Sequence, residues 1–190
     1  MRSIQSHWYW VLLPLVLLMG LDRSFGQAPI SVDQQASFLL RALSFDRNLK
    51  KRSPDGIHIA VIYQGDGENA HQVAEAFNRA GEAGIRGLAV KATAIPFQSV
   101  GKILSQVDAE GINIIYIHSS IERGLSSIQQ VTRGKKVPSL SGSKTLVEMG
   151  ASVGVYILNG APKIAINLRA SKIEGLAFGA GILGVSTVIK

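Results

Sequence analysis

Residues 150–168 read GASVGVYILNGAPKIAINL, and this stretch decides the fold of the chain. Two apolar runs, 152–158 and 163–168, flank the dipeptide Asn159-Gly160. An Asn-Gly pair between two such runs favours a type I′ turn, because both central residues need a positive φ. The stretch therefore predicts a β-hairpin in which Asn159 and Gly160 are structural residues.

The second strand of this hairpin carries one polar residue, Asn167, among apolar neighbours. A buried amide has to be hydrogen-bonded, so we interpret Asn167 as a structural residue that ties the strand to the following helix. A ligand contact is the alternative. A helix rich in alanine and glycine is expected next, after which the chain runs to its end. We expect the hairpin to complete the domain as an edge of its sheet.

Strands and helices alternate upstream of the hairpin. The segment IHIAVIY at 57–63 is apolar on both faces, which is typical of a central strand covered from both sides. Two capping boxes, Ser31 with Gln34 and Ser119 with Glu122, predict the starts of helices. We expect further strands over 88–95, 112–117 and 137–140, and helices over 31–51, 68–83, 97–107, 120–132 and 143–149. This order predicts an α/β three-layer sandwich with a mixed, mainly parallel sheet flanked by helices, a C-terminal hairpin and a closing helix.

The N-terminus has the pattern of a secretory signal peptide over residues 1–26. A basic start precedes an apolar run over 8–20, and small residues lead to a predicted cut after Gly26. A membrane anchor is the alternative, but it needs about 20 apolar residues, whereas this run has 13 and contains Pro14. We therefore expect a periplasmic protein with one domain over 27–190.

Charge and cysteine content exclude several classes of function. Removing residues 1–26, which carry two arginines and one aspartate, lowers the formal net charge from +7 to +6. The two densest basic runs, 50–52 and 133–136, fall at expected helix ends, where cations complement the helix dipole. We therefore expect no nucleic-acid partner. The chain has no cysteine, which excludes disulfides, thiol nucleophiles and zinc–thiolate sites.

The carboxyl ends of two strands carry the candidate ligand-binding residues, because open α/β sheets bind ligands at that edge. The turn at Gly65 has the position of a phosphate-binding loop, but Asp66 would repel a phosphate, and a plain turn is the favoured interpretation. His118 beside Ser119 could suggest a hydrolase, but no G-x-S-x-G motif accompanies the pair. The candidates for a ligand contact are Gly65, Asp66, His118, Ser119 and Ser120.

Two further patterns are better explained by structure than by chemistry. The segment SGSKT at 141–145 lacks the Gly-Lys pair of a phosphate loop, and we interpret it as a helix cap. The histidines His58, His71 and His118 lack the spacing of metal ligands. We therefore expect no metal, no cofactor and no enzymatic activity.

Taken in order, several segments of the chain resemble the YfiR family of exported bacterial proteins. The resemblance covers most of residues 27–190 and rests on packing motifs, so it is more specific for fold than for activity. The matching segments are ASFLL at 36–40, the first buried strand at 57–63, IYIH at 115–118, GASVG at 150–154, IAINL at 164–168, and the stretch from Glu174-Gly175 through Ile182-Leu183.

The resemblance implies a non-catalytic periplasmic repressor. Such proteins form homodimers and hold a membrane-bound diguanylate cyclase inactive by contacting its periplasmic part, and an outer-membrane lipoprotein can sequester them. Two departures from the family pattern matter. Cysteines common in the family are absent, which excludes redox control, and the first helix ends in Phe45-Asp46-Arg47-Asn48 without the family's aromatic-proline ending.

The leading hypothesis is an exported regulator that acts by protein–protein contact as a homodimer, with the first helix and the hairpin as contact surfaces. Its partner would be the periplasmic domain of a diguanylate cyclase or of a sensor kinase. The alternative is a single-lobed small-molecule binding module, with the ligand near Gly65, Asp66 and residues 118–120. A hydrolase that uses His118 is a third hypothesis.

Overall fold

A computed structural model describes residues 30–65, 67–121 and 124–190. Within these residues, seven strands form one sheet in the order β2-β1-β3-β4-β5-β6-β7. Neighbours from β2 to β5 are parallel, β6 is antiparallel to β5, and β7 is parallel to β6. The strands are β1 (Ile57–Tyr63), β2 (Val90–Pro96), β3 (Ile114–Ile117), β4 (Ser139–Ser141), β5 (Val153–Leu158), β6 (Ala161–Asn167) and β7 (Thr187–Ile189). The predicted mixed, mainly parallel sheet is confirmed.

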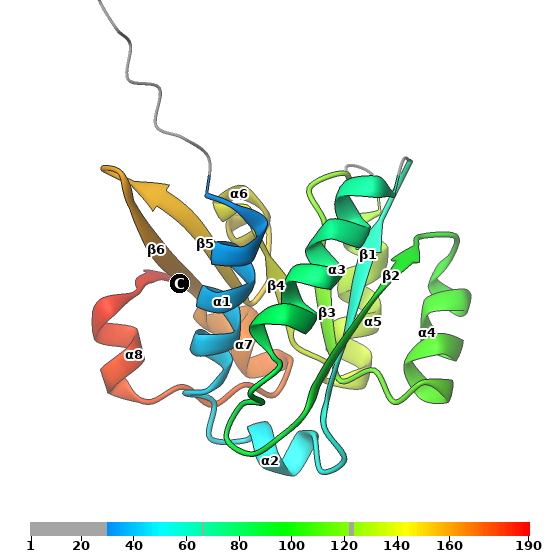
Figure 1. The fold of residues 1–190 in the computed structure, drawn as a ribbon, viewed down its shortest axis with the longest axis horizontal. Coiled ribbons are helices and arrows are strands. Elements are labelled where there is room, and N and C mark those ends of the chain that lie inside the picture. Colours follow the sequence, from blue (N-terminus) through cyan, green and yellow to red (C-terminus); the bar gives the residue numbers. More distant parts are fainter. Residues whose placement is uncertain (1–29, 66, 122–123) are drawn as a thin grey trace, which may run out of the picture.

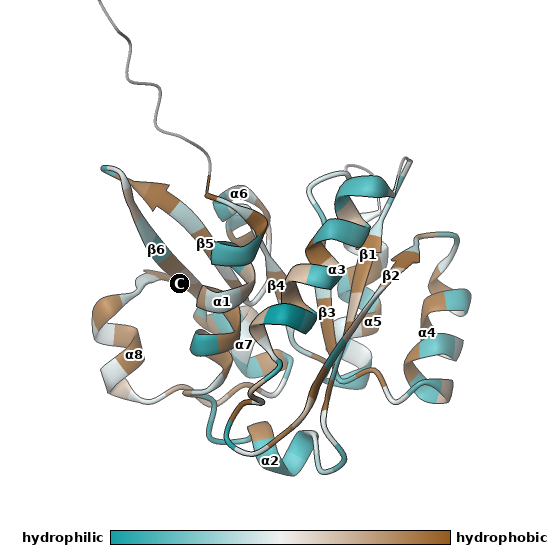
Figure 2. Cartoon of the chain, in the orientation of Figure 1, coloured by the Kyte–Doolittle hydropathy of each residue, from teal (hydrophilic) through white to brown (hydrophobic). Residues whose placement is uncertain are grey.

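Helices cover both faces of this sheet, which gives the three-layer sandwich (Figure 1). Helices α1 (Val32–Leu43) and α3 (Glu68–Ala80) pack on one face, and α4 (Val100–Ala109), α5 (Leu125–Lys135) and α6 (Lys144–Glu148) pack on the other. Strand β1 feeds both cores, since Ile59 and Val61 belong to one and Ala60 and Ile62 to the other. Figure 2 accordingly shows apolar central strands between helices whose outer surfaces are hydrophilic.

The first helix begins as predicted but ends earlier. The backbone N–H of Gln34 donates to Ser31 Oγ (3.2 Å), and the N–H of Ser31 donates to Gln34 Oε1 (3.4 Å), so the capping box is present. The helix ends at Leu43, and a separate short helix, α2 (Leu49–Arg52), follows. The prediction of one helix to residue 51 was wrong because Asp46 turns into the protein and bonds a distant backbone N–H.

Helix α5 starts later than the sequence predicts. It begins at Leu125 with Gly124 as its N-cap, so the expected start at residue 120, capped by Ser119, was wrong. The physical reason is that Ser120 is used elsewhere: its Oγ bonds His118 Nδ1 and accepts from the N–H of Gln64. Glu122, the other half of the expected capping box, lies outside the described residues.

The C-terminal hairpin forms as predicted but is not the edge of the sheet. Asn159 (φ 52°) and Gly160 (φ 75°) join β5 to β6, and Leu158 pairs with Ala161. After α7 (Leu168–Ile173) and α8 (Ala180–Val185), the chain returns as β7 along the C-terminal half of β6. The expected closing helix is therefore two short helices, and β7 forms the outer edge beside residues 165–167 of the hairpin.

The predicted signal peptide over residues 1–26 lies outside the described residues. In the part of the chain that the structure describes, no helix is both long enough and apolar enough to cross a membrane.

Candidate functional site

The histidine at the carboxyl end of β3, His118, is buried, with 7% of its surface exposed. Its Nδ1 lies 2.8 Å from Ser120 Oγ and 3.2 Å from the backbone nitrogen of Ser120. Because that N–H donates to Nδ1, the proton of the ring sits on Nε2, which donates to Asn69 Oδ1 at 2.8 Å. Both ring nitrogens are therefore used within the protein.

This arrangement favours the neutral form of His118. Burial lowers the pKa of His118 below its ordinary value, and a protonated ring could no longer accept from Ser120. Since the hydroxyl of Ser120 also accepts from the N–H of Gln64 (3.0 Å), the cluster ties the ends of β1 and β3 to the start of α3. It forms a structural bridge in which neither ring nitrogen of His118 is left without a partner.

Two other candidate ligand residues lie near this bridge, Gly65 and Ser119. Gly65 is exposed with a positive φ of 73°, and Ser119 is exposed. The candidate Asp66 lies outside the described residues. Close packing requires glycine at the neighbouring position 67, because a Cβ atom on Gly67 would lie 2.6 Å from the Tyr63 ring. Packing of Tyr63 thus explains one glycine of the turn without a bound phosphate.

Asn167 lies at the junction of β6 and α7 and is 9% exposed. Its Oδ1 accepts from the N–H of Ala170 (3.0 Å) and caps α7, while its Nδ2 donates to the carbonyl of Val147 (3.0 Å). The amide therefore has the geometry of the structural tie expected from the sequence, between the last long strand, α7 and α6.

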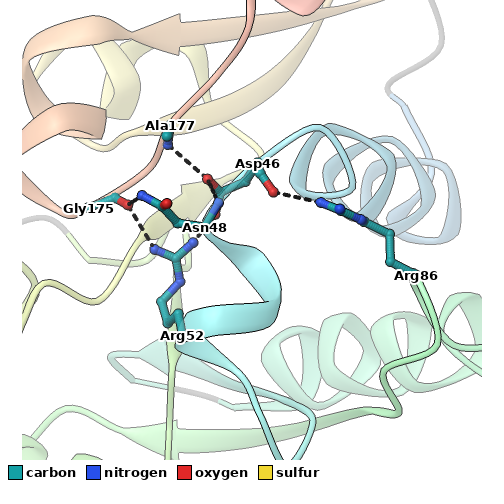
Figure 3. A network of polar contacts seen from close by, with 6 residues as sticks. All are labelled: Asp46, Asn48, Arg52, Arg86, Gly175 and Ala177. Carbon is teal, nitrogen blue, oxygen red and sulfur yellow. Dashed lines mark hydrogen bonds and ion pairs between the residues drawn. The ribbon is translucent and has the colours of Figure 1, made fainter.

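A second polar network, which sequence reasoning missed, holds the segment that follows α7 (Figure 3). The buried Asp46 accepts from the N–H of Ala177 (2.8 Å) through Oδ1, and its Oδ2 forms an ion pair with Arg52. Asn48 and Arg52 both donate to the carbonyl of Gly175, at 2.9 Å and 3.3 Å. Burial lowers the pKa of Arg52 to about 10, and the negative charge of Glu174 opposes this shift.

Glu174 holds the same segment from its other side. The carboxylate is fully buried and accepts from the N–H of Ser139 (2.7 Å), from the Ser139 hydroxyl and from the Ser152 hydroxyl. Burial raises the pKa of Glu174, and these hydrogen bonds oppose the shift. We call residues 174–177 with Asp46, Asn48 and Arg52 the C-terminal clamp. The one sequence signal for it was Asp46 two residues before Asn48, the spacing of an Asx turn.

Beyond the clamp, the chain enters α8, which borders an apolar groove on the surface. The groove has a volume of about 260 Å³ and lies between α1, the first half of β6, and α8. Two of its apolar side chains are well exposed, Phe45 at 47% and Val185 at 74%. We call it the α1/α8 groove, and its lining residues are Phe38, Arg41, Phe45, Pro162, Lys163, Ile164, Gly181, Ile182 and Val185.

A larger cavity of about 450 Å³ lies at the opposite edge of the sheet from His118. It is formed at the amino ends of β1 and β3, and its walls include Arg52, His58 and Lys136. Of the candidate ligand residues that the structure describes, none lines this cavity or the α1/α8 groove. Among the described residues, no three His, Asp or Glu side chains come together as a metal site.

Solved structures with a similar fold include a domain in complex with an amino acid and a substrate binding protein. One is the ABC domain from Streptococcus pneumonia in complex with L-Trp (TM-score 0.57, 19% identity, 83% of this chain and 62% of that one). Another is a ligand-free, open substrate binding protein with adhesive properties from Clostridium difficile (TM-score 0.58, 14% identity, 85% and 60%). The chain thus spans about three fifths of the length of each of these two proteins.

At such low sequence identity these similarities establish the fold alone. Comparison with curated proteins gives no match. Comparison with protein families is more informative, because the model of the YfiR/HmsC-like family matches residues 33–187, a range that holds nearly all of α1, strands β1 to β6 and the clamp. The chain belongs to the YfiR/HmsC-like family.

Proposed function

We propose that this chain is an exported regulator without catalytic activity, which inhibits a membrane-bound diguanylate cyclase by contact with the periplasmic part of that enzyme. The observation that carries the proposal is the family match over residues 33–187, which supports a periplasmic, regulatory role. The contacts around His118 are compatible with it, because both ring nitrogens are already used by hydrogen bonds within the protein.

The sequence predicted two contact surfaces, the first helix and the hairpin, and both contribute residues to the α1/α8 groove. Both border the α1/α8 groove, in which apolar side chains remain exposed. Exposed apolar patches of this kind mark interaction sites on soluble proteins. The groove therefore supports an action by protein–protein contact.

The proposal is tested by deleting the gene and measuring intracellular cyclic-di-GMP. We expect a rise, and a return to the original level when the full chain is expressed from a plasmid. Unchanged cyclic-di-GMP in the deletion strain would contradict the cyclase as target. A change in the phosphorylation of a response regulator would then point to a sensor kinase instead.

We also propose that the protein is a homodimer and that an outer-membrane lipoprotein can sequester it. Because β7 forms the outer edge of the sheet beside residues 165–167 of β6, its outer backbone groups are candidates for pairing with a second copy. Light scattering on residues 27–190 at tens of micromolar should give the mass of a dimer. A monomer at that concentration would contradict this part of the proposal.

A small-molecule binding module is the second candidate, favoured by the fold it shares with substrate-binding proteins. Its ligand would lie near Gly65, Asp66 and residues 118–120. A thermal-shift screen with free amino acids, L-tryptophan included, tests it, because a ligand that binds only the folded state raises the Tm. No shift at millimolar concentration would count against this candidate.

A further inference from the structure

The α1/α8 groove lies beside an uncharged stretch of unusual length. Residues 176–189 contain no Asp, Glu, Lys, Arg or His. They include α8 and β7. Helix α8 lies on the outside of the molecule and consists of apolar residues and two glycines, drawn from brown to white in Figure 2. An external helix normally carries charges on its solvent side. Helix α8 has none, which is the composition of a helix that packs against another protein surface.

The polar residues that line the groove are of one charge. Arg41 on α1 and Lys163 on β6 are both exposed, and no Asp or Glu is among the lining residues. The partner of such a surface would bring carboxylates to the two cations and apolar side chains to the space between Phe45 and Val185. Opposite charge at the rim sets orientation and speeds association, while the apolar centre supplies most of the affinity.

The strand that borders the groove argues against an extended peptide as occupant. Strand β7 pairs only with residues 165–167 of β6, which leaves the outer side of residues 161–164 without a neighbouring strand. That stretch contains Pro162, which has no N–H to donate, and Lys163, and both residues disfavour the addition of a strand. A helix needs no backbone bonds from the groove, because its own are satisfied internally.

We propose that the α1/α8 groove binds an amphipathic helix of the partner protein, with an apolar side chain between Phe45 and Val185 and carboxylates facing Arg41 and Lys163. The inference rests on the proposed function, since it names the part of the partner that is contacted. The groove volume of about 260 Å³ suits one or two large apolar side chains and not a whole domain. A short helix is therefore sufficient as the contacting element.

Site-specific photo-crosslinking in the native periplasm tests this directly. The full chain carries p-benzoylphenylalanine at position 185, at position 45, or, as a matched control, at the exposed position 72 on α3. We expect positions 185 and 45 to give an adduct with one protein and position 72 to give none. The cross-linked peptide should combine apolar residues at helical spacing with Asp or Glu within one turn.

Charge reversal completes the test. The double variant Arg41→Glu with Lys163→Glu should reduce the adduct roughly tenfold, and replacing the carboxylates of the identified peptide by lysine should restore it. An adduct with a second copy, an adduct with lipid, a peptide without carboxylates, or no adduct at all would each overturn the inference. Circular dichroism and the Tm of each variant show whether it is folded.

The same strains separate this inference from the proposed function. If the unmodified chain lowers cyclic-di-GMP while positions 45 and 185 give no adduct, the regulatory function stands and the groove is not its contact site. If the unmodified chain leaves cyclic-di-GMP unchanged but the predicted adduct forms, the groove binds such a helix and the target is a different protein.

Discussion

The carboxyl edge of the sheet around His118 and the α1/α8 groove differ in how completely the protein satisfies its own groups. At the carboxyl edge, His118, Ser120 and Asn69 bond one another or nearby backbone, and the histidine is buried. In the groove, Phe45 and Val185 leave large apolar surfaces exposed. The polar cluster at His118 can thus be explained by its structural role, whereas the exposed apolar side chains of the groove indicate an interaction site.

The C-terminal clamp shares one property with each of these two regions. It is buried and polar like the His118 cluster, yet it fixes residues 174–177 and through them the path of the chain into α8. It positions the groove without lining it. Substitutions in the three regions should therefore separate into losses of stability and losses of function.

The largest loss of stability is expected in the clamp. Asp46→Ala leaves Arg52 without its ion-pair partner and the N–H of Ala177 without its acceptor, so the free energy of unfolding should fall by about 3–5 kcal/mol. Urea denaturation measures this loss, with the exposed Asp55→Ala as a control that should change it by less than about 0.5 kcal/mol. A loss below about 1 kcal/mol for Asp46→Ala would show that the clamp is dispensable.

Asn167→Ala should have the next largest effect. It removes the cap of α7 and the bond to the carbonyl of Val147, for an expected loss of about 1–3 kcal/mol. The same denaturation experiment, with the exposed Gln72→Ala as a control, provides the measurement. Unchanged stability together with altered partner binding would reverse our interpretation and make Asn167 a contact residue.

Glu174 should make the protein less stable as pH rises. Its folded-state pKa is raised, so its stabilising contribution is complete below the unfolded value of about 4.3 and is lost as pH rises through the folded one. Glu174→Gln should therefore show a smaller fall in the free energy of unfolding between pH 5 and pH 8 than the natural chain. An unaltered pH profile would mean that Glu174 does not control it, and Glu110→Gln is the exposed control.

His118 should act in the opposite direction and more weakly. Its folded-state pKa is lowered, so its contribution is present above the unfolded value of about 6.5 and is lost as pH falls through the folded one. The His118→Gln variant should lose less stability on acidification than the natural chain, because it has no ring nitrogen whose protonation would break the hydrogen bond from the N–H of Ser120. The exposed His71→Gln should leave that loss in place, and equal profiles for the two variants would contradict the neutral tautomer.

Local sequence patterns predicted much of the fold because the interactions behind them are local. The strand at Ile57–Tyr63 has its predicted bounds, and the Asn159-Gly160 turn has the two positive φ values that its residues favour. The first helix was predicted too long because the partner of Asp46, the N–H of Ala177, lies 131 residues away. No pattern within the helix could reveal that contact.

The groove was harder to predict than the cluster at His118. Its walls come from three separate segments, around Phe45, Ile164 and Val185, which only the folded chain brings together. The return of the chain as β7 was also missed, since three residues at a terminus carry too little pattern to predict a strand. Both features depend on the path that the chain takes after β6.

The central claim is that function lies in the α1/α8 groove and not at the carboxyl edge. Intracellular cyclic-di-GMP in a deletion strain complemented with Val185→Asp or with His118→Gln tests it most directly. Both variants should fold at neutral pH, since Val185 is 74% exposed and the neutral amide introduced by His118→Gln can still bond the neighbours of the ring. We predict that His118→Gln restores low cyclic-di-GMP and that Val185→Asp does not. Repression by Val185→Asp, together with its loss in a folded His118→Gln protein, would contradict the account.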